Sequence, residues 1–236
     1  MKNNVQLIEM VERQRFGVEY QPIIDTNSGE VFAYEALARF FNPAGDHISP
    51  LQVFCALHDS PLMLAQVELQ LKRLQLRFRP DHYPLFINLD PHAFSMLKDS
   101  SGGNELLRRL GNEDSLIVEL IENTDVNDAQ MSNEVSDLFH KAGISIALDD
   151  VGAPGTMVAL NILNDVDYIK FDRFWFNPNS ESMLPLLKSL IRFARDSGKK
   201  TVLEGVENAE DLAKAVNLGV DYVQGFFYRE LFIQEQ

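Results

Sequence analysis

The chain has 236 residues, of which 45% are hydrophobic, which is enough for one domain with a sizeable core or at most two small ones. No linker is visible, so we expect a single domain over residues 1–236. Its formal net charge of −14 argues against non-specific binding to DNA or RNA, which depends on clustered Lys and Arg. A small anionic ligand is not excluded, because divalent cations can lie between acidic side chains and a phosphate.

A single cysteine, Cys55, excludes an internal disulfide and a thiolate metal cluster. Residues 1–16 are rich in charge and resemble neither a signal peptide nor a membrane span. No apolar run approaches the roughly 20 residues that a spanning helix needs. These features predict a cytoplasmic protein without a membrane segment.

Short runs rich in Val, Ile, Phe and Tyr recur along the chain and predict strands. In chain order they cover residues 18–24, 30–38, 84–90, 116–121, 144–150, 166–172, 200–205 and 220–225.

Amphipathic segments between these runs predict helices. They cover residues 49–59, 61–78, 127–143, 182–198 and 208–219. The last three end at Gly143, Gly198 and Gly219, which suit a left-handed helix cap, and each is followed directly by a strand.

Alternating strands and helices favour parallel pairing through right-handed crossovers. The first two strands are an exception. Only residues 25–29 separate them, so they should form an antiparallel hairpin. The pattern predicts an α/β fold, a modified (β/α)₈ barrel of the TIM type with one antiparallel strand; a doubly wound open sheet is the alternative.

Polar residues end nearly every predicted strand, at the edge where such barrels carry their chemistry. The acidic and amide residues at these ends are Asn88, Glu119, Glu122, Asp149, Asp150, Asp172, Glu204, Glu207 and Gln224, and Lys170 is the basic one. Any one carboxylate could merely cap the following helix, and Lys170 could be a solvated lysine. Several acids on one small rim, however, would raise one another's pKa unless cations neutralised them.

Oxygen ligands without nearby His or Cys ligands indicate Mg²⁺ or Mn²⁺. The adjacent Asp149 and Asp150 are suited to a site with two ions, the first bridging and the second extending to one ion. Two such ions can hydrolyse a phosphodiester by clamping the phosphate and activating a water for in-line attack. Lys170 would then orient that water or offset the developing negative charge.

The chain resembles the EAL-domain family of cyclic di-GMP (c-di-GMP) phosphodiesterases from about residue 18 to about residue 230. The resemblance rests on ordered motifs at consistent spacing: YQPIID, GEVFAYEALARF, FINLDP, VELIEN, ALDDVG, VDYIKFD, LEGVEN and VDYVQGFFY. It implies a modified (β/α)₈ barrel and metal-dependent opening of c-di-GMP to linear pGpG.

The resemblance also implies roles for individual residues. One metal would be held by Glu35, Asn88, Glu119 and Asp149. A second would be held by Asp149 and Asp150 with support from Glu204. Lys170 would position the attacking water, and Glu122 would steady the loop after the paired aspartates. The implied substrate contacts are Gln21, Leu37 and Arg39, with Gln224 closing the same rim, and a homodimer is compatible with the family.

The loop after Asp150 departs from the family pattern, because residues 151–160 read VGAPGTMVAL in place of a run with a Phe and several hydroxyls. Near the end, QGFFYRELF lacks the usual proline, and Asp90 replaces a common serine and is expected to cap a helix. The altered loop supports a rival hypothesis, a c-di-GMP-binding or protein-interaction regulator with little catalytic activity. An unrelated sugar- or phosphate-metabolising barrel enzyme would require the ordered motifs to be coincidental.

Overall fold

The core of the fold is a barrel of strands. The computed structural model describes residues 9–100, 103–121, 126–155 and 160–235. Within these residues the barrel strands are β1 (Phe16–Asp25), β2 (Val31–Phe41), β4 (Leu85–Asn88), β5 (Leu116–Ile121), β6 (Ser145–Val151), β7 (Tyr168–Phe171), β8 (Lys200–Glu204) and β9 (Tyr222–Gln224). Neighbours along the sheet run β1-β9-β8-β7-β6-β5-β4-β2, and β1 also pairs with β2, so the ring is closed. The open-sheet alternative is therefore wrong, and the predicted barrel is confirmed.

The predicted hairpin is present at the start of the barrel. β1 is antiparallel to both of its barrel neighbours, β2 and β9, whereas the pairs from β2 round to β9 are parallel. The turn is short because Asp25 Oδ1 accepts hydrogen bonds from the backbone N–H groups of Asn27 and Ser28, and Gly29 has a φ of 75°. β1 is thus the one reversed strand of the barrel.

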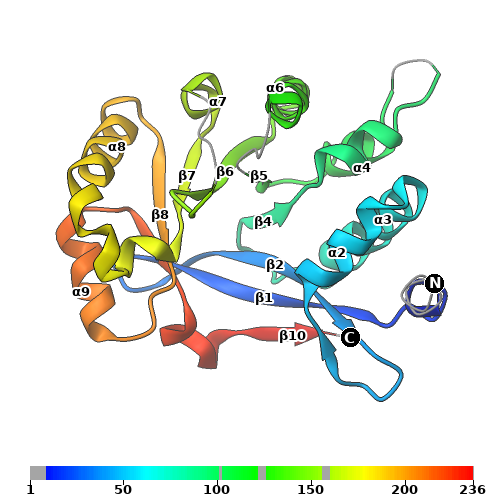
Figure 1. Cartoon of the computed structure of the whole chain (residues 1–236), viewed down its shortest axis with the longest axis horizontal. Helices are drawn as coiled ribbons and strands as arrows, with labels where there is room; N and C mark the ends of the chain where they lie inside the picture. Colours follow the sequence, from blue (N-terminus) through cyan, green and yellow to red (C-terminus); the bar gives the residue numbers. More distant parts are fainter. Residues whose placement is uncertain (1–8, 101–102, 122–125, 156–159, 236) are drawn as a thin grey trace.

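Two edge strands were not predicted from the sequence. β3 (His47–Ile48) pairs with β2, and β10 (Ile233–Glu235) pairs antiparallel with β1 (Figure 1). Both are too short to show an alternation of apolar and polar residues. β10 brings the C-terminal segment alongside β1.

Helices surround the barrel on its outer side (Figure 1). They are α2 (Pro50–His58), α3 (Pro61–Arg77), α4 (Pro91–Met96), α5 (Glu105–Leu110), α6 (Val126–Lys141), α7 (Leu160–Asp165), α8 (Leu184–Asp196) and α9 (Ala209–Leu218). The glycines predicted to follow α6, α8 and α9 have φ values of 77°, 72° and 78°. Asp90 caps α4 as predicted, since its side chain accepts hydrogen bonds from the N–H groups of His92 and Ala93. No helix in the described part of the chain is long and apolar enough to span a bilayer.

An apolar cluster made by alternate strand residues fills one layer of the barrel. Its buried members come from seven strands and are Ile23, Ala33, Phe86, Ile117, Ala147, Val202 and Tyr222, with Tyr168 packed against them. Side chains two residues apart on a strand point to the same face. The residues two positions further toward the same end of the barrel therefore also point inward, and these form the candidate site.

Candidate active site

The inward-facing layer next to the apolar cluster consists almost entirely of residues singled out in the sequence. Each follows a member of the cluster by two positions, or precedes it by two on the reversed strand β1. The residues are Gln21, Glu35, Asn88, Glu119, Asp149, Lys170, Glu204 and Gln224. The regular alternation of strand side chains is thus the local reason why residues so distant in sequence converge.

Lys170, on β7, lies at the centre of this layer. Its Nζ atom is 2.5 Å from Glu119 Oε1, 2.7 Å from Glu204 Oε1, 2.8 Å from Asp149 Oδ1 and 3.2 Å from Glu35 Oε2. The side chain of Lys170 is completely buried, which excludes the reading of a solvated strand-end lysine. One ammonium group therefore contacts four carboxylates from four other strands.

Two amide side chains hold Glu35 from the other directions. Asn88 Nδ2 donates hydrogen bonds to Glu35 Oε1 at 2.9 Å and to Glu119 Oε2 at 3.0 Å, and Gln224 Nε2 donates to Glu35 Oε2 at 2.6 Å. Both carboxylate oxygens of Glu35 are therefore bonded, so its charge is compensated although the side chain is buried. As a metal ligand, Asn88 would instead present Oδ1, which exchanges places with Nδ2 when the amide flips.

A bulge in β6 explains how two consecutive aspartates share one rim. Adjacent strand residues normally face opposite sides, but the pairing of β6 with β7 shifts register between Leu148 and Val151. Asp150 has a φ of 56°, a left-handed backbone conformation that is uncommon for a non-glycine residue. This local strain turns Asp150 toward the same site as Asp149.

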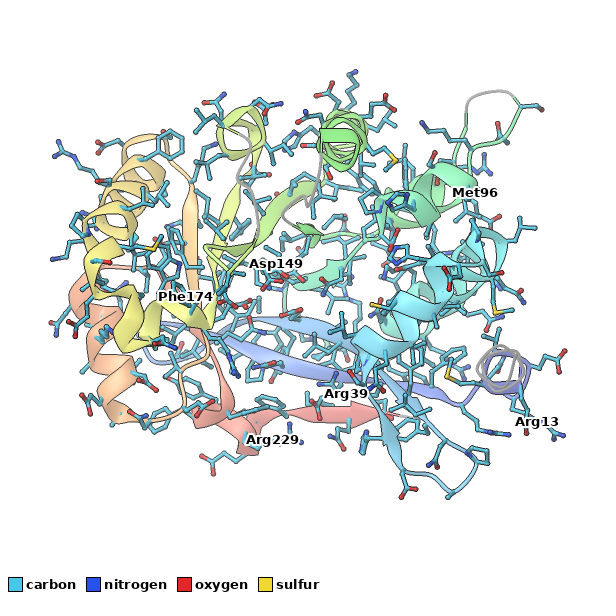
Figure 2. All side chains as sticks on the ribbon, in the orientation of Figure 1. Arg13, Arg39, Met96, Asp149, Phe174 and Arg229 are labelled. Carbon is cyan, nitrogen blue, oxygen red and sulfur yellow. The ribbon has the colours of Figure 1, made fainter. Side chains whose placement is uncertain are left out.

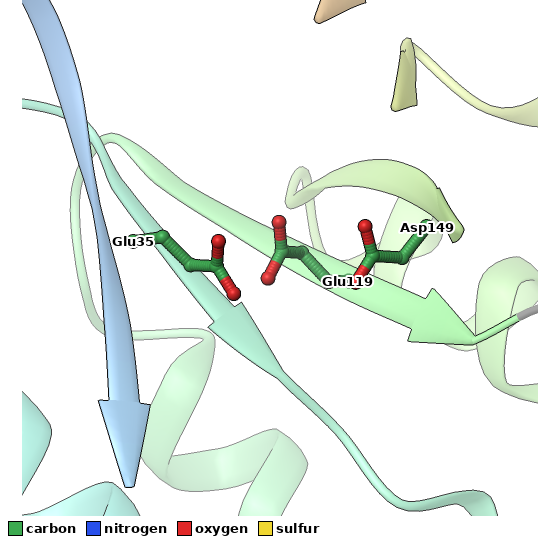
Figure 3. A group of neighbouring side chains, drawn as sticks. All are labelled: Glu35, Glu119 and Asp149. Atoms are coloured by element: carbon green, nitrogen blue, oxygen red, sulfur yellow. The ribbon is translucent and has the colours of Figure 1, made fainter. Parts of the chain in front are cut away.

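The carboxylates form two groups that share Asp149. In the first, oxygen atoms of Glu35, Glu119 and Asp149 lie within 4.8 Å of one another (Figure 3). In the second, the same holds for Asp149, Asp150 and Glu204. Oxygen-only ligand sets of this kind suit hard divalent cations.

The electrostatics of the site indicate an excess of negative charge. Burial alone would lower the pKa of Lys170, but the four surrounding carboxylates raise it well above its ordinary value. Burial raises the pKa of Glu119 and Glu204 well above the usual range. Burial, followed by the neighbouring charge of Asp149, raises the pKa of Asp150 to about 7. The acids compete for one ammonium group, so a further cation would relieve their repulsion.

A cavity of about 240 Å³ opens onto these carboxylates. Gln21 and Leu37, two of the predicted substrate contacts, line it. Its other lining residues are Glu35, Asp149, Asp172, Arg173, Glu204, Gly205, Glu207, Gln224, Gly225 and Phe226. Arg173 and Phe226 carried no recognisable signal in the sequence, whereas Asp172 and Glu207 lie at noted strand ends but were assigned no role.

Two other residues with predicted roles, Arg39 and Glu122, are not placed in the cavity lining by the structure. Arg39 does not line the cavity and instead forms an ion pair with the buried Glu19, at 2.5 Å between Nη2 and Oε1. Glu122 lies outside the described residues, as does part of the altered loop, residues 156–159. The described start of that loop is anchored, because Trp175 Nε1 donates a hydrogen bond to the carbonyl oxygen of Val151 at 2.8 Å.

Comparison with known proteins gives matches along nearly the whole chain. The chain is 26% identical over 236 residues to a probable cyclic di-GMP phosphodiesterase, PdeN, of Escherichia coli K12, covering 96% of this chain but 45% of that protein. It thus spans about half the length of that relative. Another relative, the cyclic di-GMP phosphodiesterase PdeL of the same organism, is 25% identical, with 92% of this chain and 63% of PdeL covered.

Solved structures show the same fold. The complex of the PaMucR phosphodiesterase with c-di-GMP superimposes with a TM-score of 0.79 at 24% identity, covering 96% of this chain and 95% of that one. The model of the EAL domain family matches residues 4–230. The chain therefore belongs to the EAL domain family.

Proposed function

We propose that the protein is a metal-dependent phosphodiesterase that hydrolyses c-di-GMP to linear pGpG. The observation that carries this proposal is the convergence of Glu35, Glu119, Asp149 and Glu204 around Lys170 at the C-terminal ends of parallel strands. Membership of the EAL domain family, whose matched relatives include proteins described as c-di-GMP phosphodiesterases, supports the choice of substrate.

The residues present fit two divalent cations, for which we propose Mg²⁺ or Mn²⁺. Glu35, Asn88, Glu119 and Asp149 would hold one, and Asp149, Asp150 and Glu204 the other. The fit rests on the two clusters of three carboxylates described above, which have Asp149 in common. A related fold, the YkuI protein of Bacillus subtilis, is described in complex with c-di-GMP and calcium, with a TM-score of 0.76 at 21% identity; 94% of this chain and 56% of that one are covered.

When bound, such cations would activate a water molecule and neutralise phosphate oxygens. The ammonium group of Lys170 has three N–H donors, and four carboxylates surround it; with cations holding those carboxylates, a donor of Lys170 would be free to position the attacking water. Asn88 and Gln224 fix the carboxylate of Glu35 through the hydrogen bonds described above. Gln21, Leu37 and Arg39 would contact the dinucleotide, and Gln224 would close the rim.

The test is turnover by the purified chain with c-di-GMP and either Mg²⁺ or Mn²⁺, with pGpG quantified by chromatography. We expect the wild type to produce pGpG and the Glu35→Ala variant to lose at least about 100-fold in kcat, since a charged group at the reacting centre is removed. Glu30→Ala, at an exposed position next to β2, is the matched control and should retain wild-type turnover. Full turnover by Glu35→Ala would refute the role of Glu35.

The second candidate is a regulator that binds c-di-GMP with little turnover, and the observation that favours it is the altered loop at residues 151–160. It predicts c-di-GMP binding by calorimetry with negligible pGpG at any concentration of Mg²⁺ or Mn²⁺. A cytoplasmic location, a homodimer and a loop-supporting role of Glu122 stay predictions of the sequence.

A further inference from the structure

Glu19 is a buried carboxylate outside the catalytic layer, and no sequence pattern marks it. It lies on β1 two residues before Gln21, opposite Leu37 of β2, and is 2% exposed. Glu19 and Gln21 are two residues apart on one strand, so their side chains lie on the same face. Gln21 and Leu37 both line the cavity. Glu19 is therefore an acidic side chain directly beside the proposed substrate site.

Among the described residues, three side chains bond to this carboxylate. Arg39 Nη2 and Arg229 Nη1 approach the same oxygen, Oε1, at 2.5 and 3.3 Å, and Gln234 Nε2 donates to Oε2. Arg229 belongs to the 3₁₀ helix η3 (Phe226–Leu231), and Gln234 belongs to β10. The C-terminal segment and the β1–β2 hairpin thus meet at Glu19 (Figure 2 labels both arginines).

The environment of Glu19 favours the ionised form of its carboxyl group. Burial alone would raise its pKa, but the hydrogen bonds from Gln234 and Arg39 outweigh that effect and hold the pKa below its usual value. One negative charge then faces two guanidinium groups, and no other ion pair of Arg39 or Arg229 is found among the described residues. The cluster therefore carries a net positive charge in a chain whose formal net charge is −14.

The two guanidinium groups are accessible to solvent, although the carboxylate of Glu19 that binds them is buried. The side chains of Arg39 and Arg229 are 24% and 54% exposed. A guanidinium group has five N–H donors, so each arginine retains donors after bonding to Glu19. Donors in this fixed fork geometry are well suited to phosphate oxygens.

The arginine pair lies away from the carboxylates around Lys170, beside residues that line the cavity. Arg39 follows Glu35 by four residues on β2, which places it about 13 Å further along the strand. The guanidinium of Arg229 lies over the ring of Phe226, 5.6 Å from its centroid, and Phe226 lines the cavity. Glu35, Asp149 and Glu204 thus line the cavity directly, whereas the two arginines lie beside residues that line it: Arg39 is on the same face of β2 as Leu37, and Arg229 lies against Phe226.

We propose that Arg229 is a second substrate-binding arginine that, together with Arg39, binds the phosphate of c-di-GMP that is not cleaved, and that Glu19 is the positioning residue for both. This inference rests on the proposed function, because it takes c-di-GMP as the ligand. A hydrolase that opens one phosphodiester of a two-phosphate ring must hold the other, and a basic site away from the carboxylates would fix which phosphate reaches them. The occupant is recognised by its negative charge, and therefore the arginines should affect binding more than chemistry.

The experiment compares KM and kcat of the full chain with Mg²⁺ or Mn²⁺ for the wild type, Arg229→Gln, Arg229→Lys and Arg192→Gln. Arg229→Gln should raise KM about tenfold, the effect of one charge-assisted hydrogen bond, with kcat within about twofold of wild type. Arg229→Lys should give an intermediate KM because the charge is kept and the fork is lost. Arg192, which pairs with Asp196 within α8, is the matched control and should leave both constants unchanged.

The role of Glu19 is tested by a double-mutant cycle. Glu19→Gln should also raise KM, and the double variant with Arg229→Gln should be no worse than about the larger single effect, because both act through one cluster. A purely structural role of Glu19 would instead lower the thermal stability and kcat, without the rise in KM at nearly unchanged kcat. If Glu19→Gln does not fold, the single variants at the exposed Arg229 still decide the proposal.

The outcomes separate the two proposals. If the wild type neither hydrolyses nor binds c-di-GMP, the proposed function fails and this inference fails with it. If the wild type binds without turnover, the dissociation constant from calorimetry replaces KM, and the same tenfold increase is expected. If the wild type is active and Arg229→Gln has the wild-type KM, this inference alone is overturned.

Discussion

The ammonium nitrogen of Lys170 lies 2.5 Å from Oε1 of Glu119, and both side chains are fully buried. Breaking a buried ion pair by removing one partner leaves an uncompensated charge that costs far more than the pair contributes. Here one lysine compensates several acids at once. We therefore expect Lys170 to stabilise the folded protein when no divalent cation is bound, in addition to its role in the proposed chemistry.

Replacing Lys170 by Met should lower the free energy of unfolding in the presence of a chelator by roughly 3–5 kcal/mol. The measurement is urea denaturation at neutral pH, with Lys188→Met, an exposed lysine on α8, as the matched control. Added Mn²⁺ should recover more stability in Lys170→Met than in the wild type, since the lysine no longer competes for the carboxylates. Equal stability of Lys170→Met and the wild type in chelator would contradict this account.

Without divalent cations, the wild type should lose stability as the pH rises from about 4 to about 7. An unfolded aspartate ionises near 3.8, whereas burial and then the charge of Asp149 raise the pKa of Asp150 in the folded protein to about 7. Between these values the folded protein keeps a proton that the unfolded chain has lost, so raising the pH favours unfolding. Excess Mg²⁺ should reduce the slope, because it neutralises the same carboxylates.

The variant Asp150→Asn isolates this contribution. Its free energy of unfolding should fall less steeply than that of the wild type over the same range, with a difference of up to roughly 4 kcal/mol, since one pKa unit corresponds to about 1.4 kcal/mol. Asp59→Asn, at an exposed position after α2, is the control and should keep the wild-type slope. An unchanged slope in Asp150→Asn would assign the pH dependence to other groups.

Gly152 should tolerate no side chain. It has a φ of 93°, and a Cβ atom there would lie 2.5 Å from the indole ring of Trp175. Gly155 has a similar φ of 90°, and no atom of the described residues lies near the position of its Cβ, so it is a matched control for backbone strain alone. Gly152→Ala should therefore be less stable than Gly155→Ala by about 1–3 kcal/mol and should also reduce turnover, because the displaced backbone carries Asp150. Equal thermal stability of the two variants would show that the indole contact is not tight.

Much of the fold and site follows from local sequence patterns. The period of two along each strand places Ala33 and Glu35, or Ala147 and Asp149, on one face, and parallel strands bring their C-terminal ends together. The strand ends alone therefore predicted the acidic rim. The five-residue turn before Glu30 predicted the reversed strand, since no crossover fits in so short a connection.

Other features depend on contacts that no local pattern records. The shared orientation of Asp149 and Asp150 requires the bulge in β6, and nothing in ALDD specifies a positive φ. Glu19 resembles a solvent-facing strand residue in sequence, and its burial becomes evident only when Arg229 and Gln234 approach from the C-terminal segment. The central place of Lys170 likewise depends on closure of the barrel, because its partners lie on β2, β5, β6 and β8.

Trp175 should report cation binding through its fluorescence. It is the single tryptophan of the chain and is buried, and its Nε1 donates a hydrogen bond to the carbonyl oxygen of Val151, the residue after Asp150. A cation bound by Asp149 and Asp150 would alter this backbone segment and the field at the indole. Titration with Mg²⁺ should therefore give a saturable change in emission, and Asp150→Asn should raise the midpoint at least about tenfold, the loss of one charged ligand. Asp59→Asn should keep the wild-type midpoint. Calorimetry could detect Mg²⁺ binding while the emission stays constant. In that case either the cation lies elsewhere, and the proposed second cation position is wrong, or the backbone at Val151 does not respond to the bound cation.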